Sequence, residues 1–215
     1  MSQTASTATV QPGTAIKTNT GALATLVIVF FFWGFIAASN SIFIPFCKTH
    51  FQLTQFESQL IGSSFYGAYF IGSLLLYLLS SIVGYDILNK IGYKKGIIYG
   101  LLISVVGALG IIPSANAGSF GLILVSFFVV ALGFSLQQTS AQPFAISLGD
   151  PATGSHRLNL AGGINSLGTT LGPIIVSFFL FGTANSAHEN VTITNVNNLY
   201  LIVAAVFAAV ALFFA

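Results

Sequence analysis

The chain has 215 residues, of which 55% are hydrophobic and only 5% are charged, with a formal net charge of +2 and a mean hydropathy of +0.91. An average soluble domain has about 25% charged residues, so this composition excludes a soluble globular protein. The small charge does not indicate a nucleic acid partner, and the single cysteine, Cys47, excludes an intrachain disulfide and a cysteine-based metal cluster.

Six apolar segments follow a polar N-terminal tail. Residues 1–20 are rich in Ser, Thr, Ala and Gln, so we predict a flexible cytoplasmic tail. An apolar run of about 20 residues is long enough to cross a bilayer as a helix. The predicted spans are residues 21–46, 57–83, 96–112, 119–148, 157–181 and 198–215. The sequence therefore predicts an all-α integral membrane protein in which residues 21–215 form one six-helix bundle.

The basic residues set the predicted orientation. One side of the six-span topology carries Lys17, Lys90, Lys94, Lys95 and Arg157, whereas only Lys48 lies on the other side. The positive-inside rule places the lysine-rich side, and with it the N-terminus, in the cytoplasm. We expect a multi-pass protein of the cell (inner) membrane.

Some of these residues also have a candidate role in gating. The topology and gating candidates are Asp86, Asn89, Lys90, Lys94, Lys95 and Arg157. We expect Arg157 and the lysines to act as lipid-facing anchors. A gating network with Asp86 or Asp150 is the alternative.

The spans contain an internal repeat. Gly34-Phe35 precedes Pro45-Phe46 in the first span much as Gly133-Phe134 precedes Pro143-Phe144 in the fourth. The glycines of the second and fifth spans are also similarly spaced, at Gly62, Gly67, Gly72 and at Gly163, Gly168, Gly172. Because three spans are an odd number, the second copy must be inverted in the membrane, which predicts a 3+3 inverted repeat.

The fourth span holds an unusual polar cluster. Its polar side chains are Gln137, Gln138, Thr139, Ser140 and Gln142. In a bilayer core each of these groups needs a partner from another helix, from water or from a ligand. Gln138 and Gln142 are four residues apart and share one helix face. Their carboxamides offer donors and acceptors together, which suits the hydroxyls of a neutral sugar.

Several stretches resemble one branch of a known family. They are Phe51-Gln-Leu-Thr-Gln-Phe56, Ser64-Phe-Tyr-Gly-Ala-Tyr-Phe-Ile71, Gln142-Pro-Phe144, and Arg157-Leu-Asn-Leu-Ala161 followed by Asn165-Ser166. These stretches resemble the fucose/glucose/galactose symporter branch of the major facilitator superfamily. The loop from Asn89 to Lys95 looks like the superfamily's loop between spans two and three, with Asn89 where an acid is common.

The resemblance covers the N-terminal half of a twelve-span transporter. It implies the major facilitator fold, a neutral monosaccharide as substrate, and transport by alternating access. It also implies a second six-helix bundle that is absent from this sequence, supplied by a C-terminal half, a second copy or another subunit. The alternative is a non-transporting member of the fold, serving as a sensor or as a structural subunit of a larger membrane assembly.

Charge distinguishes this chain from proton-coupled members of the branch. Those members carry an aspartate in the first span and a glutamate in the fourth, where Ser41 and Gln138 stand here. Neither side chain titrates, whereas a proton-driven carrier needs a group that changes charge. We therefore expect facilitative transport or coupling without protons, for example to sodium through neutral oxygens, unless the second bundle carries the proton.

The candidate sugar-binding residues combine amides, a hydroxyl and aromatic rings. They are Gln137, Gln138, Gln142, Asn40, Ser41, Asn165, Trp33, Tyr66 and Tyr69. The resemblance ties Asn165 to sugar recognition and puts Gly162 where a glutamine stands in a fucose carrier. The structural alternatives are bonds to neighbouring helices for the amides, and helix packing or lipid contact for the rings.

No enzyme, cofactor or metal site is predicted. His50, His156 and His188 have no metal-ligand spacing and lie in loops or at span ends. The spans contain no carboxylate pair for acid–base chemistry and no Ser/His/Asp set that their spacing would assemble.

Overall fold

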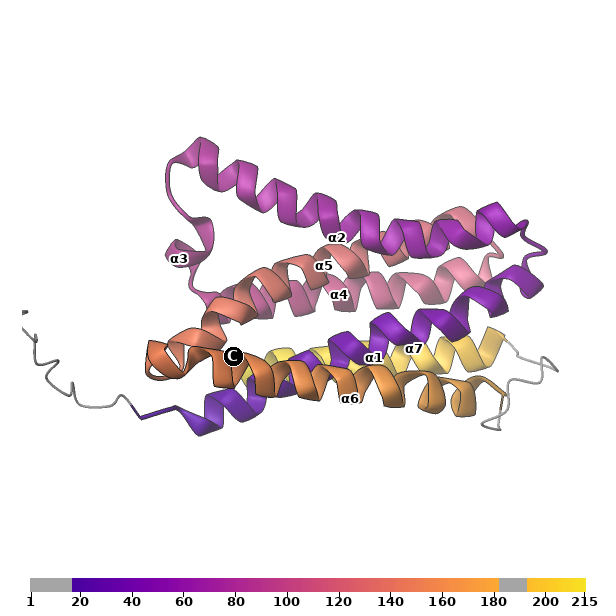
Figure 1. Ribbon diagram of the computed structural model, residues 1–215. Coiled ribbons are helices and arrows are strands. Elements are labelled where there is room, and N and C mark those ends of the chain that lie inside the picture. The colour runs from indigo at the N-terminus through magenta and orange to yellow at the C-terminus, as the bar shows by residue number, and fades with distance from the viewer. Residues whose placement is uncertain (1–16, 182–192) are drawn as a thin grey trace, which may run out of the picture.

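The computed structural model describes residues 17–181 and 193–215, and these residues form a bundle of six long helices and two short ones (Figure 1). The elements are α1 (Thr20–His50), α2 (Gln55–Val83), α3 (Ile87–Ile91), α4 (Tyr93–Asn116), α5 (Phe120–Ser147), the 3-10 helix η1 (Pro151–Thr153), α6 (Gly154–Phe181) and α7 (Ile193–Phe214). This confirms the predicted all-α class. Most of the predicted tail, and the predicted loop after residue 181, lie outside the described residues.

Five of the described helices, α1, α2, α4, α5 and α7, are long and apolar enough to cross a membrane. The remaining long helix, α6, has 28 residues and carries more polar side chains. It packs along α1 and matches the predicted fifth span. The six predicted spans therefore correspond to the six long helices.

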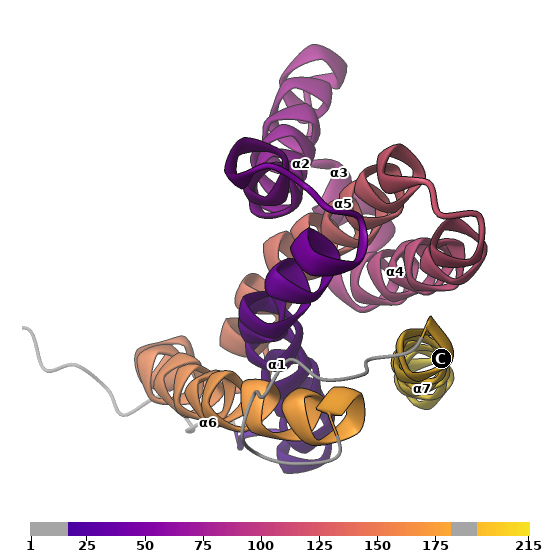
Figure 2. The same cartoon turned by 90° about the vertical axis from the view of Figure 1, so that its right-hand side faces the viewer.

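Two of the helix pairs in the bundle can be compared with the predicted 3+3 inverted repeat. α1 packs along α6, and α2 packs along α5. Figure 2, which views the bundle from one end, shows α6 beside α1 and α4 between α5 and α7. In an inverted repeat the pair of spans one and five maps onto the pair of spans four and two. The pairs α1–α6 and α2–α5 are therefore equivalent under this mapping.

Two loop boundaries differ from the predictions. The predicted third span ends at residue 112, but α4 continues through Pro113 to Asn116. A proline can lie within a membrane helix, where it leaves only the carbonyl one turn earlier without its helical donor. The predicted loop at residues 84–95 contains α3, which Asp86 caps by accepting a hydrogen bond from the Leu88 amide at 2.9 Å.

Glycines bring α1 and α6 into backbone contact. A Cβ atom added to Gly34 would lie 2.0 Å from the Asn165 carbonyl oxygen, and one added to Gly168 would lie 2.0 Å from the Phe31 carbonyl oxygen. Gly172 lies similarly close to Phe35. Because glycine has no side chain, the two helix backbones can approach closely at these positions. α1 and α6 thus form one tightly packed pair, and together they form one wall of an internal cavity.

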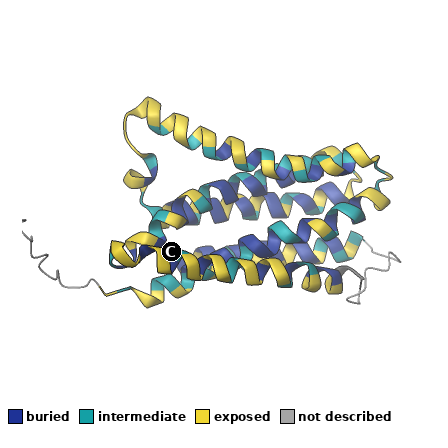
Figure 3. Cartoon of the chain, viewed as in Figure 1, coloured by how far each residue is buried: buried dark blue, intermediate teal, exposed yellow. Residues whose placement is uncertain are grey.

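By contrast, α2 is loosely packed along its second half. Large apolar side chains there are exposed, among them Phe70, Tyr77 and Ile82. Figure 3 shows this exposed stretch where α2 diverges from the rest of the bundle. In a membrane protein such a face contacts lipid or another helical bundle.

Candidate functional site

A cavity of ≈ 370 Å³ lies among α1, α2, α5 and α6. The predicted site residues that line it are Trp33, Tyr66, Tyr69, Gln138, Gln142 and Asn165. No lining residue carries a formal charge. The structure therefore brings together residues from four helices that are far apart in the sequence.

Gln138 and Gln142 enter the cavity from α5, one helical turn apart. Within the described part of the chain, neither carboxamide makes a hydrogen bond. Each amide group can donate two hydrogen bonds and accept two. The α5 wall thus presents unused donors and acceptors to the cavity.

Asn165 forms part of the α6 wall and is half-buried. Its Nδ2 donates to the Phe30 carbonyl oxygen at 2.9 Å, which ties α6 to α1. The structural role considered for Asn165, bonding a neighbouring backbone, is therefore present. Its Oδ1 acceptor has no partner among the described residues, so a role toward a ligand is compatible with that bond.

Aromatic rings form most of the remaining wall. Trp33 lies 4.5 Å from Phe30 between ring centroids, and Phe65 meets Phe134 edge-on at 5.8 Å. The Tyr69 hydroxyl is buried and has no hydrogen-bond partner among the described residues. A buried hydroxyl without a partner is costly, so a ligand hydroxyl would satisfy it. Tyr66 is 63% exposed and lies at the rim.

Gln137 does not line the cavity, although it was grouped with the sugar-binding candidates. Its side chain is fully buried, at 0% exposure. Its Oε1 accepts from Trp33 Nε1 at 3.1 Å, and its Nε2 donates to Ser104 Oγ at 3.0 Å. Neighbouring positions on a helix point about 100° apart, which explains why Gln137 and Gln138 have different surroundings.

Asn40 and Ser41 also lie outside the cavity lining. Ser41 is exposed, and its hydroxyl donates to the Ala38 carbonyl at 2.7 Å. Asn40 is buried, and its Nδ2 has no partner in the described part of the chain. The structure thus separates Asn40 and Ser41 from the cavity-lining candidates of α5 and α6.

Thr169 lines the cavity but was not among the predicted residues. It follows Asn165 by one helical turn, and its hydroxyl donates to the Asn165 carbonyl at 3.1 Å. The i, i+4 spacing from Asn165 was the signal that could have identified it.

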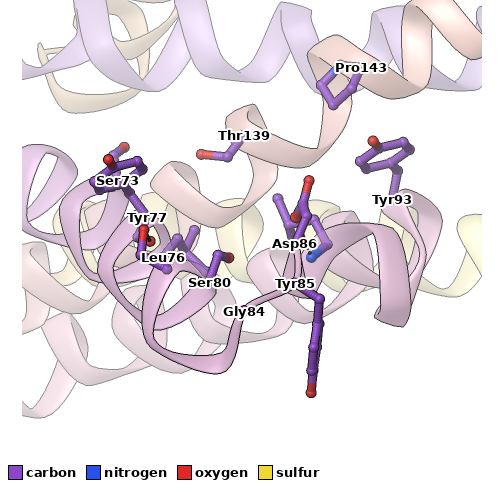
Figure 4. Close-up of a pocket in the computed structure, with 12 residues that line it drawn as sticks. Ser73, Leu76, Tyr77, Ser80, Gly84, Tyr85, Asp86, Tyr93, Thr139 and Pro143 are labelled. Atoms are coloured by element: carbon purple, nitrogen blue, oxygen red, sulfur yellow. Dashed lines mark hydrogen bonds between the residues drawn. The ribbon is translucent and has the colours of Figure 1, made fainter.

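A second, larger cavity of ≈ 690 Å³ opens where α2 diverges from α5 (Figure 4). Its lining includes Ser73, Ser80, Tyr85, Asp86 and Thr139. The carboxylate of Asp86 is engaged in capping α3. This cavity therefore lacks the pair of unpartnered amides that marks the smaller one.

The remaining loop candidates lie near this second cavity. Lys90 Nζ donates to Tyr85 Oη at 3.1 Å and lies 4.4 Å above the same ring. Asn89 accepts a hydrogen bond from the Tyr93 hydroxyl, and Lys94 and Lys95 are exposed. Exposed lysines next to a bilayer suit the predicted topological role.

Arg157 differs from the lipid-facing anchor that was expected. Only 4% of it is exposed. Its guanidinium donates to the carbonyls of Ala145 at 2.7 Å, Ile146 at 2.7 Å and Asp150 at 2.9 Å. The last carbonyls of a helix lack partners within it, and a cation is favourable there. Arg157 therefore caps the C-terminal end of α5, and it contacts Asp150 through the backbone.

The long apolar helices and the cavity among them define a polytopic α-helical membrane protein with an internal cavity. Residues 22–215 match the Major Facilitator Superfamily, and the chain belongs to this superfamily.

Individual relatives agree with this assignment. The chain is 37% identical over 203 residues to a glucose/galactose transporter of Brucella abortus, covering 94% of this chain and 47% of that protein. It is 31% identical over 204 residues to the L-fucose-proton symporter of Escherichia coli, covering 88% and 45%. A crystal structure of the transporter FucP in the outward conformation superimposes with a TM-score of 0.72 and 30% identity, covering 90% of this chain and 48% of that one. The chain thus spans about half the length of these relatives, all of them transporters.

Proposed function

We propose that the complete protein carries a neutral hexose across the membrane by alternating access, and that this chain supplies one of two six-helix bundles enclosing the sugar. The observation that carries the proposal is the pair of carboxamides Gln138 and Gln142, which have no hydrogen-bond partner among the described residues and line a cavity whose described lining is uncharged. A sugar has both donor and acceptor hydroxyls and an apolar ring face. Amides meet the first requirement, and the Trp33 and Tyr69 rings meet the second.

The second bundle completes the site in this proposal. The relatives are about twice as long as this chain, which supports a further bundle as the partner. The unpacked second half of α2 is an apolar surface that such a bundle would cover. The bundle is a C-terminal half, a second copy or another subunit.

Transport is facilitative, or coupled to an ion other than the proton. The support is chemical: Gln138 does not titrate, and Ser41 is a hydroxyl bonded to the backbone of its own helix. A proton-coupled site needs a group whose charge changes during the cycle. The proposed location is the inner membrane, with the N-terminus in the cytoplasm. This orientation is supported because the start of α1 and the lysine-rich segment around α3 lie at the same end of the bundle (Figure 1).

Uptake of radiolabelled glucose, galactose and fucose by vesicles containing the complete protein tests this function. We expect saturable uptake, with KM about tenfold higher in Gln138→Ala because one buried hydrogen-bonding side chain is lost. Thr139→Ala is the matched control, since Thr139 is the next residue on α5 and faces the other cavity. Absence of uptake above empty vesicles would contradict transport, and sugar binding without uptake would instead support a sensor.

The same vesicles test the coupling. We expect an imposed proton gradient to leave sugar accumulation unchanged. Gln138→Glu should make uptake depend on pH, because it introduces a titratable group into the cavity. Accumulation that a proton gradient drives and a protonophore abolishes would contradict the coupling proposal and would assign the proton carrier to the second bundle.

Tyr69→Phe is expected to lower the affinity for hexose without lowering the stability of the protein. The buried Tyr69 hydroxyl has no partner among the described residues, so its removal should leave the empty protein equally stable or up to about 1 kcal/mol more stable. Hexose affinity should fall about fivefold, because a sugar hydroxyl loses its partner. Tyr77→Phe, which lies on the same helix, is exposed and lines the other cavity, serves as the control. Thermal melts with and without sugar measure both effects, and an unchanged affinity would remove Tyr69 from the site.

A further inference from the structure

We infer that Gln137 is a positioning residue, which holds the indole of Trp33 in the orientation that the sugar cavity requires. The inference rests on the proposed function, because it concerns the wall of the same cavity. Trp33 lines that cavity, whereas Gln137 lies behind it and is fully buried. Any effect of Gln137 on sugar must therefore pass through a neighbouring group.

A chain of hydrogen bonds connects Trp33 to the interior of the bundle. Trp33 Nε1 on α1 donates to Gln137 Oε1 on α5 at 3.1 Å. Gln137 Nε2 donates to Ser104 Oγ on α4 at 3.0 Å, and that hydroxyl donates to the Val130 carbonyl on α5 at 3.1 Å. Three helices are thus linked through one side-chain amide.

The direction of these bonds fixes the orientation of the amide. The hydroxyl of Ser104 uses its single proton on the Val130 carbonyl, so toward Gln137 it can only accept. The NH₂ group of Gln137 must then face Ser104, which leaves the carbonyl oxygen for the indole N–H. An indole nitrogen can only donate, so the two requirements agree.

Packing also prevents the amide from turning away. A Cβ atom added to Gly100 would lie 2.6 Å from Gln137 Cγ, so α4 approaches this side chain closely. Gly133 allows the same two helices to approach, with its missing Cβ 2.4 Å from the Gly100 carbonyl oxygen. The glutamine is therefore confined on one side and bonded at both ends of its amide.

The bond to Gln137 determines which part of Trp33 faces a ligand in the cavity. With its N–H bonded to Gln137, the indole offers the cavity a fixed apolar ring against which a sugar ring can stack. Without that acceptor the buried N–H would have no partner, and the ring would turn to find one in the cavity. The aromatic wall of the cavity would then lose its fixed geometry.

The test uses the full-length protein with Gln137→Met, which keeps the length of the side chain and removes both hydrogen bonds. We expect KM for hexose uptake to rise about threefold to tenfold, with little change in kcat. In the Trp33→Phe background, where no indole N–H remains, Gln137→Met should add little to KM. The same fold-change in both backgrounds would show that Gln137 acts by another route and would overturn the inference.

A sugar-independent readout separates this inference from the proposed function. Trp33 is the only tryptophan of this chain, so 5-fluorotryptophan labelling with Trp33→Phe as the assignment control reports on its indole by ¹⁹F NMR. Gln137→Met should shift and broaden that resonance without any sugar present. Gln137→Glu should resemble wild type at low pH, where the neutral carboxyl can accept from the indole and donate to Ser104, and should diverge as pH rises. An unchanged resonance in Gln137→Met would overturn the inference, whereas absent hexose uptake in wild type would overturn the proposed function alone.

Discussion

Gly168→Ala is expected to destabilise the bundle by about 3 kcal/mol and to abolish hexose binding. The added Cβ would lie 2.0 Å from the Phe31 carbonyl oxygen and 3.0 Å from the Phe35 amide nitrogen. These are backbone atoms, so no side chain can turn aside to relieve the overlap. α1 and α6 must separate, and the nearby bond from Asn165 to the Phe30 carbonyl would then lengthen or break. The cavity wall formed by these two helices would lose its shape.

A matched control is available on the same helix. An added Cβ at Gly163 would meet no atom within 4 Å. Gly163→Ala should therefore be neutral, or stabilise by up to about 1 kcal/mol through helix propensity. Thermal melts in detergent and hexose binding measure both variants. Equal melting temperatures for the two would show that the α1–α6 contact is looser than its geometry indicates.

Arg157→Ala is expected to be the most damaging single change outside the cavity, with a loss of about 4 kcal/mol in stability. It leaves the carbonyls of Ala145 and Ile146 without the guanidinium donor, and it removes the contacts to the Asp150 carbonyl and, at 2.9 Å, to the Thr153 hydroxyl. Arg157→Lys should recover only part of the loss. A single ammonium cannot reproduce the geometry of a guanidinium that reaches several carbonyls at once.

The neighbouring residue provides the control for this prediction. His156 is exposed, so His156→Ala should leave the melting temperature and the yield of monodisperse protein unchanged. Arg157→Ala should lower both. If the two alanine variants melted together, the cap on α5 would contribute little to stability.

The amides that line the cavity were predictable because their signals are local. Gln138 and Gln142 share a helix face by their spacing, and Asn165 matched a family stretch. The role of Gln137 was not predictable in the same way. Its partner Trp33 lies 104 positions away, and no local pattern shows which distant side chain a buried glutamine bonds.

Arg157 and Pro113 show a second limit of sequence reasoning. A basic residue at a span end usually faces the lipid headgroups, and only the fold reveals that the end of α5 needs a donor at that point. Proline usually ends a helix, but α4 continues past Pro113 to Asn116, as membrane helices tolerate. In both residues tertiary context outweighed the local preference.

The glycine contact between α1 and α6 has a consequence for motion. Two backbones in direct contact have no intervening side chains to repack, so the pair should move as a rigid body. In the proposed transport cycle, Trp33 and Asn165 would then keep a constant separation. The sugar would meet the same half-site at entry and at exit. Any change in affinity along the cycle would therefore arise from α2, from α5 or from the opposite bundle.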